Sequence, residues 1–338
     1  MPLWTDIYDP AELTGFARAA FEDLEGRDDS LARFLPNALR DDITVSFTVG
    51  ENGLVEEAEF RAYDAPPSVG SVAGGKRVVL ELPAIGREHI VPEYAQLKNR
   101  NAGDEAIRSA IERAAIRAVK AVAERMERQR GIALLTGKST INQVNFKSDD
   151  DFGRDPALTH TASQLWDAGT TGRLEFLEQM VDLYTEKNGG IAPGVILAGR
   201  KAVRLLKAGD DFKATTGSRV ISNAEMGGVL DDHGIPPILA YNRRTRAGLV
   251  IPENTILFLP APGDPNDEFG TDLGATYWGR TLTSQHEAYN LADDEQSGIV
   301  VGVTRGDKPP MIAEVVSDAI GLPVLENANL SLAVKVAA

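Results

Sequence analysis

One long stretch of helical periodicity constrains the fold of this chain more than any other feature. Between Asp104 and about Leu135, small and aliphatic residues recur every three or four positions, as on one face of a helix: Ile107, Ile111, Ala115, Ala118, Val122 and Met126. Acidic residues open the stretch and basic residues lie near its end, so the charges complement the helix dipole. At about 1.5 Å per residue the helix would span roughly 45 Å. We therefore expect a spine that crosses a flat, extended molecule.

The composition narrows the classes of function. The chain has 338 residues, enough for two or three domains. Its formal charge of -15 argues against binding nucleic acid by phosphate neutralisation and gives no support to an anionic membrane surface as partner. The absence of cysteine excludes disulfides, thiolate metal sites and a cysteine nucleophile. Neither a signal-peptide pattern nor a long apolar run is present, so we expect no membrane partner.

The first ninety residues predict an arm and a long hairpin. Residues 1–41 hold one short helical pattern, at Leu13, Phe16, Ala20 and Leu24, and we expect an arm with little core of its own. In 42–92, apolar and polar residues alternate over 43–49, and a second extended run follows through Phe60 and Tyr63. A hairpin tip at 64–75, rich in proline and glycine, and a returning strand at 76–82 complete the expected hairpin. Such strands often pair with another subunit. We therefore predict contacts with adjacent subunits at Lys76, Arg77, Val78, Phe16 and Leu24.

The second half of the chain changes to a mixed helix and strand pattern. We expect a strand over 141–146 and an acidic loop over 149–151. The pattern then predicts helices at 174–188, 202–207 and 222–232, and strands at 195–197, 238–241 and 255–259. Three strands follow at 299–303, 311–316 and 330–336. Strands on both sides indicate that a compact domain, roughly 155–285, is inserted into a second domain built from sheet and spine.

The motifs that could carry chemistry are better explained by structure. Gly131–Ser139 resembles a phosphate-binding loop, but it follows a helix and has five residues between its glycines instead of four, so we predict a helix end with Gly137 left-handed. The four histidines lie far apart, without metal-ligand spacing. The acidic runs 149–151 and 293–295 do not match a calcium loop. We therefore predict no catalytic residue, no metal and no cofactor.

The order of the expected elements resembles a known fold. An arm, a long hairpin, a spine helix, an inserted α/β domain and terminal strands are similar to the Hong Kong 97-like fold of tailed-bacteriophage major capsid proteins, and more specifically to the lambda-type major capsid protein E family. Three segments carry the likeness: Pro92–Lys138, which ends in ALLTGK, Pro252–Leu257 with Gly274-Ala275-Thr276 following, and Leu330–Val336.

The resemblance implies both an architecture and a function. The fold would be α+β, divided into an N-terminal arm (1–41), an extended loop (42–92), a peripheral domain with the spine helix (93–154), an axial domain (155–285) and the C-terminal strands of the peripheral domain (286–338). The subunit would form hexamers and pentamers of an icosahedral shell around double-stranded DNA, contacted without sequence specificity. Scaffold, portal and decoration proteins are further expected partners. Assembly in the host cytoplasm would yield the capsid of the virion.

Three alternatives stay open. An encapsulin-type nanocompartment has the same fold and would hold a groove for a targeting peptide. An α/β enzyme would have its site in 155–285 and would need ionisable groups with shifted pKa values in a pocket. A covalent bond between Lys76 and Asn327 or Asn329 of a neighbour is a third alternative. We expect a non-covalent shell instead, because lambda-type relatives lack that bond and Lys76 is an ordinary strand-edge residue.

Overall fold

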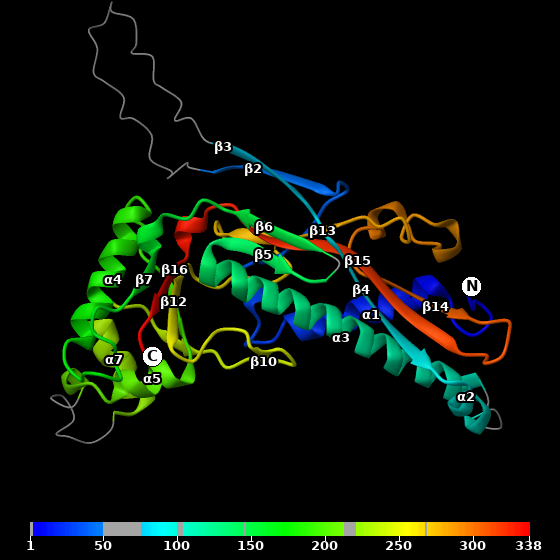
Figure 1. The fold of residues 1–338 in the computed structure, drawn as a ribbon, viewed down its shortest axis with the longest axis horizontal. Helices are drawn as coiled ribbons and strands as arrows, with labels where there is room; N and C mark the ends of the chain where they lie inside the picture. Colours follow the sequence, from blue (N-terminus) through cyan, green and yellow to red (C-terminus); the bar gives the residue numbers. More distant parts are fainter. Residues whose placement is uncertain (1–2, 50–75, 100–103, 145, 213–220, 268) are drawn as a thin grey trace, which may run out of the picture.

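The computed structural model describes residues 3–49, 76–99, 104–144, 146–212, 221–267 and 269–338. The molecule is elongated, and helix α3 (Asp104–Thr136) crosses its middle (Figure 1). Two five-stranded sheets lie toward its two ends, and the described residues also form three two-stranded sheets, β2-β3, β5-β6 and β10-β11. The predicted α+β class and the predicted spine are both confirmed.

The helix α3 follows the predicted stretch closely. Its buried side chains include five of the six periodic positions: Ile111, Ala115, Ala118, Val122 and Met126. The helix ends at Gly137, which has a positive φ of 68° and whose N–H donates to the carbonyl of Ala133 at 2.8 Å. The segment that resembles a phosphate-binding loop is therefore a helix end, as predicted.

One glycine lies inside this helix for a packing reason. A Cβ atom at Gly131 would lie 2.5 Å from Cγ1 and 3.0 Å from the carbonyl oxygen of Val250. Val250 lies between the short strand β11 (Gly248–Leu249) and strand β12 (Thr255–Leu259). Gly131 thus lets α3 touch this segment directly, although glycine weakens a helix interior.

The first sheet has the strand order β1-β13-β15-β14, and β4 also pairs with β15. Its strands are β1 (Asn37–Leu39), β4 (Ala84–Val91), β13 (Gly274–Gly279), β14 (Val300–Arg305) and β15 (Ala313–Leu325). Helix α1 (Pro10–Glu25) packs against both α3 and β14, and the ring of Phe21 meets that of Trp278 edge-on at 5.4 Å. The predicted arm therefore shares a hydrophobic core with the spine.

The second sheet has the order β7-β16-β12-β8-β9. Its strands are β7 (Thr159–Thr161), β8 (Val195–Ala198), β9 (Ile238–Ala240), β12 and β16 (Leu332–Lys335). Around it lie α4 (Arg173–Lys187), α5 (Arg200–Lys207) and α7 (Asn223–Asp232), as Figure 1 shows. Ser222 and Glu225 form a capping box at the start of α7. The predicted α/β pattern is confirmed element by element.

Several predicted elements need correction. The strand predicted at 141–146 is a hairpin of β5 (Lys138–Asn142) and β6 (Lys147–Asp151), so the acidic run is a strand and not a loop. Cross-strand partners explain this, because Lys138 Nζ lies 2.7 Å from Asp151 and the Thr140 hydroxyl donates to Asp149 at 2.6 Å. The strand predicted at 311–316 extends to Leu325. Strand β4 and helix α2 (Glu93–Asn99) were not predicted as separate elements.

The two sheets exchange strands across the predicted domain limits. Strand β13 lies within 155–285 in sequence but pairs with β1 and β15 in the first sheet. Strand β16 follows β15 in sequence but pairs with β12 and β7 in the second sheet. The division into domains therefore stays a prediction. Its limits have to place β13 with the first sheet and β16 with the second.

Candidate assembly surfaces

The hairpin of β2 (Thr44–Val49) and β3 (Lys76–Glu81) forms a sheet of its own. Val45 and Leu80 pair with each other and are buried against the main core. Their neighbour Val79 is 59% exposed, and Ile43 before the hairpin is 52% exposed. One face of the hairpin therefore rests on its own subunit while the other presents apolar side chains to solvent.

The predicted contact residues lie in different surroundings. Lys76 and Arg77 belong to β3, but their side chains lie outside the described part of the molecule. Val78 is half-buried and packs against the core of its own subunit. Phe16 is half-buried on α1, and Leu24 packs against the core shared with the spine. The structure does not bring these five residues to one place, and their contacts with neighbours stay predictions.

A second apolar surface lies at the end of the molecule opposite α4. Strand β4 and helix α2 meet at this end (Figure 1). Ile90 on β4 is 54% exposed, and Tyr94 and Leu97 on α2 are 76% and 55% exposed. Large apolar side chains that gather in solvent commonly mark an interaction site. This surface was not predicted from the sequence.

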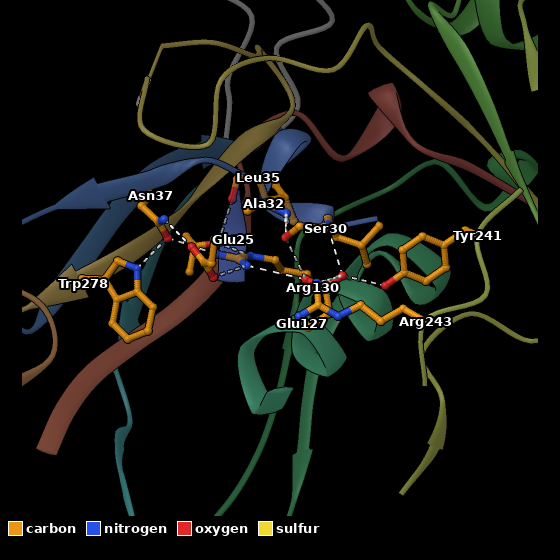
Figure 2. A network of polar contacts seen from close by, with 12 residues as sticks. Glu25, Ser30, Ala32, Leu35, Asn37, Glu127, Arg130, Tyr241, Arg243 and Trp278 are labelled. Carbon is orange, nitrogen blue, oxygen red and sulfur yellow. Dashed lines mark hydrogen bonds and ion pairs between the residues drawn. The ribbon is translucent and has the colours of Figure 1, made fainter. Parts of the chain in front are cut away.

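A buried polar network ties the arm to the spine (Figure 2). Glu127 on α3 is 1% exposed and accepts hydrogen bonds from the N–H of Leu31 at 2.9 Å and from the Tyr241 hydroxyl at 2.6 Å. Arg243 lies 3.4 Å from the same carboxylate. Burial and the charge of Glu127 raise the pKa of Tyr241, so its hydroxyl stays protonated and donates.

Arg130, one turn further along α3, completes this Glu127–Arg130 network. Its fully buried guanidinium donates to Glu25 at 2.6 Å, to Asn37 at 3.0 Å and to Thr276 at 2.8 Å. The indole N–H of Trp278 donates to the same Asn37 oxygen at 2.8 Å. Glu25 and Glu127 balance the charges of Arg130 and Arg243. The network was missed from the sequence, although Arg130 follows Met126 by four residues and continues the buried stripe of α3.

A second buried arginine joins the spine to the second sheet. Arg154 donates to the carbonyls of Leu134 and Leu135 at 2.8 and 2.7 Å, and to the Thr159 hydroxyl at 2.8 Å. It thereby satisfies carbonyls at the end of α3, where the helix dipole favours a cation. Burial lowers the pKa of Arg154 to about 10, which still leaves it charged at neutral pH. The end of the spine is thus fastened to β7.

The residues considered for chemistry do not converge. His233 contacts Glu178 at 2.7 Å on the surface, and the run Asp293–Glu295 forms a short exposed helical turn. In the described ranges, no group of three His, Cys, Asp or Glu side chains is placed to hold a metal ion. Among the described helices, none has the length and apolar character to cross a membrane. The described part of the molecule instead presents exposed apolar side chains that could contact partners.

Comparison with solved structures identifies the fold. A prophage protein of Escherichia coli CFT073 described as a capsid protein matches with a TM-score of 0.65 at 16% identity, over 97% of this chain and 99% of its own. A phage-related protein from Bordetella bronchiseptica RB50 matches with a TM-score of 0.60 at 14% identity, over 96% of each chain. The capsid of the cyanophage P-SCSP1u gives 0.50 at 10% identity, over 90% of this chain and 86% of that one. The Hong Kong 97-like fold is therefore confirmed. No curated protein sequence matches the chain.

A family model decides between the two kinds of shell protein. Residues 41–267 match the family described as phage major capsid protein E, which favours a phage capsid over an encapsulin and over an enzyme. The match spans well over half of the chain. The protein therefore belongs to the phage major capsid protein E family and is a shell subunit of a tailed phage.

Proposed function

We propose that the subunit assembles as hexamers and pentamers into an icosahedral shell that encloses double-stranded DNA. The observation that carries this proposal is the β2–β3 hairpin, which forms its own sheet and exposes apolar side chains in a member of a capsid family. Different patches on each partner would meet, so the interfaces would be heterologous and would close through curvature. The role is structural, without catalysis or a cofactor.

Each part of the chain would have its own role in the shell. Residues 1–41 serve as the arm, 42–92 as the extended loop, 93–154 and 286–338 as the peripheral domain and 155–285 as the axial domain. Lys76, Arg77 and Val78 on the hairpin, with Phe16 and Leu24 on the arm, contact adjacent subunits. Support comes from the exposed face of the hairpin and from the partial exposure of Phe16.

Other partners follow from the same role. A scaffold, a portal and a decoration protein would act with the shell during assembly in the host cytoplasm, and DNA would be contacted without sequence specificity. The excess of acidic residues would weaken contacts with the phosphates of DNA, which suits a container that has to release its DNA. We also propose a non-covalent shell, because the Asn329 side chain already accepts the N–H of Asp155 at 2.9 Å within its own subunit.

Negative-stain electron microscopy with size-exclusion chromatography tests the proposal. We expect hollow shells of uniform size, or rings of five and six subunits, from the purified protein or after co-expression with a scaffold. A chain that stays monomeric under both conditions would contradict shell assembly. Deletion of 64–75 should abolish assembly, and a denaturing gel should show single subunits without a ladder.

A further inference from the structure

The exposed side of α3 carries a row of basic side chains. Arg113, Arg117, Lys120 and Arg128 follow one another at spacings of four, three and eight residues, which places them on one side of the helix. The first three are exposed and Arg128 is half-buried. Along the helix axis these four residues, the α3 basic row, extend for about 22 Å. Glu124 is the one acidic residue on the same side of this stretch.

A groove beside the row adds cations from other elements. It has a volume of about 1010 Å³ and lies between α3, β4 and the β5–β6 hairpin. Five cationic side chains line it: Arg87 of β4, Arg246 of the turn before β11, and Arg117, Lys120 and Arg125 of α3. Glu124 is the one carboxylate among its described lining residues. Since the whole chain has 50 acidic and 35 basic residues, this surface is opposite in charge to the rest of the molecule.

These cations have few anionic partners in their own subunit. Lys120 lies 4.0 Å from Glu124. Within the described ranges, Arg113, Arg117 and Arg128 pair with no carboxylate. Burial and the neighbouring Arg128 lower the pKa of Arg125. A negatively charged ligand would offset the repulsion among these cations, so the row and the groove are complementary to an anion.

The side chains that line the groove favour a polyanion over a protein partner. Protein interfaces usually bury apolar anchor residues at their centre. The apolar residues Val122, Ile141 and Leu322 line the groove but are already buried in the subunit. Among the large apolar residues described there, Phe146 alone is exposed, whereas the β4–α2 end of the molecule exposes three such side chains. The groove therefore has the cations of an anion-binding site but few of the anchors of a protein-binding site.

Double-stranded DNA matches the row in length and in density of charge. A duplex carries one negative charge per about 1.7 Å of its axis, so roughly 13 phosphates lie along the length of the row. An extended acidic polypeptide carries at most one charge per about 3.3 Å. Contacts between basic side chains and phosphates require no particular base sequence. The row can therefore hold any stretch of duplex.

We propose that the α3 basic row and the adjoining groove bind the phosphates of the packaged double-stranded DNA. This inference rests on the proposed shell function and assigns its DNA contact to particular residues. It places the exposed side of α3 on the inside of the shell. Because the rest of the subunit is acidic, DNA would touch the shell at one repeated place in each subunit.

Fluorescence anisotropy with a short DNA duplex tests the site in the unassembled subunit at increasing salt. Arg117→Gln with Lys120→Gln should raise the Kd at low salt at least about tenfold and lower the slope of log Kd against log salt by about 2, because two phosphate contacts are lost. The matched control, Arg200→Gln with Arg204→Gln, removes two exposed cations of α5. It should keep the Kd within about twofold of the natural value, with an unchanged slope. An equal slope for the natural subunit and the Arg117–Lys120 variant would overturn the proposal.

Polyglutamate of the same total charge distinguishes DNA from an acidic protein segment. We expect it to bind at least about tenfold more weakly than the duplex, because its charges are spaced more widely. Equal or tighter binding of polyglutamate would assign the surface to an acidic protein, and the proposal would be wrong.

Electron cryo-microscopy of DNA-filled shells separates this inference from the proposed function. We expect DNA density against the exposed side of α3, and weaker density there in the Arg117–Lys120 variant. Shells in which α3 faces outward, or in which the row touches no DNA, would overturn this inference while shell assembly stands. A natural chain that forms no shell even with a scaffold would refute the proposed function itself.

Discussion

Charged side chains in two regions of α3 lie in opposite surroundings. In the Glu127–Arg130 network, every buried charge has a partner from the arm, the spine or the 241–243 segment. In the groove of about 1010 Å³ between α3, β4 and the β5–β6 hairpin, the exposed Arg117 lies on the same helix without a described carboxylate partner. A buried charge must be compensated inside its own subunit, because its desolvation is costly. An exposed cation survives without a partner in the subunit and is free to bind one outside it.

The largest effect should come from breaking the network. The variant Arg130→Ala would leave the carboxylates of Glu25 and Glu127 without a major partner, so we expect a loss of about 3–5 kcal/mol in the free energy of unfolding. Chemical denaturation of the unassembled subunit, followed by circular dichroism, measures it. A loss below about 1 kcal/mol would mean that water or other groups replace the guanidinium.

A smaller effect is expected where α3 touches Val250. The variant Gly131→Ala places a Cβ atom 2.5 Å from a side-chain carbon and 3.0 Å from a backbone oxygen. We expect a destabilisation of about 1–3 kcal/mol from overpacking. Gly228 on α7 is the matched control, because a Cβ there meets nothing within 4 Å. Gly228→Ala should stabilise the subunit by about 0.5–1 kcal/mol, and equal signs for the two variants would contradict the packing argument.

A weaker, pH-dependent effect is expected at the junction between spine and second sheet. Hydrogen bonds from Lys187 at 2.7 Å and from the N–H of Ala157 at 2.9 Å lower the pKa of Asp155. The charged carboxylate therefore stabilises the fold above about pH 4, and this contribution is lost as pH falls through the lowered pKa. Asp155→Asn should reduce the drop in melting temperature between neutral and acidic pH. An unchanged drop would show that Asp155 does not contribute.

The smallest change in stability is expected at Arg117 on α3. Arg117→Ala removes a cation from the same helix as Arg130, yet it should change the free energy of unfolding by less than about 0.5 kcal/mol. The same denaturation measurement applies. A loss as large as that of Arg130→Ala would show that Arg117 has a structural partner within its own subunit.

Features encoded by neighbouring residues were predicted well. The spine helix, its end at Gly137 and the cap of α7 at Ser222 all depend on residues within a few positions of one another. The acidic run at 149–151 was predicted wrongly, because its strand forms only by pairing with β5. Its three consecutive acidic residues suggested a loop, whereas the cross-strand partners on β5 decide its conformation.

The sequence by itself determined the helical spine, the order of helices and strands over 173–259, and the resemblance to phage capsid proteins, because periodicity and caps are local signals. Only the tertiary structure decided that β16 joins the second sheet, that Tyr241 meets Glu127 across 114 positions, and that five cations gather at one groove. These contacts join residues far apart in the chain, so no short pattern encodes them. They form because folding brings apolar faces together and leaves each charge either paired inside or exposed for a partner.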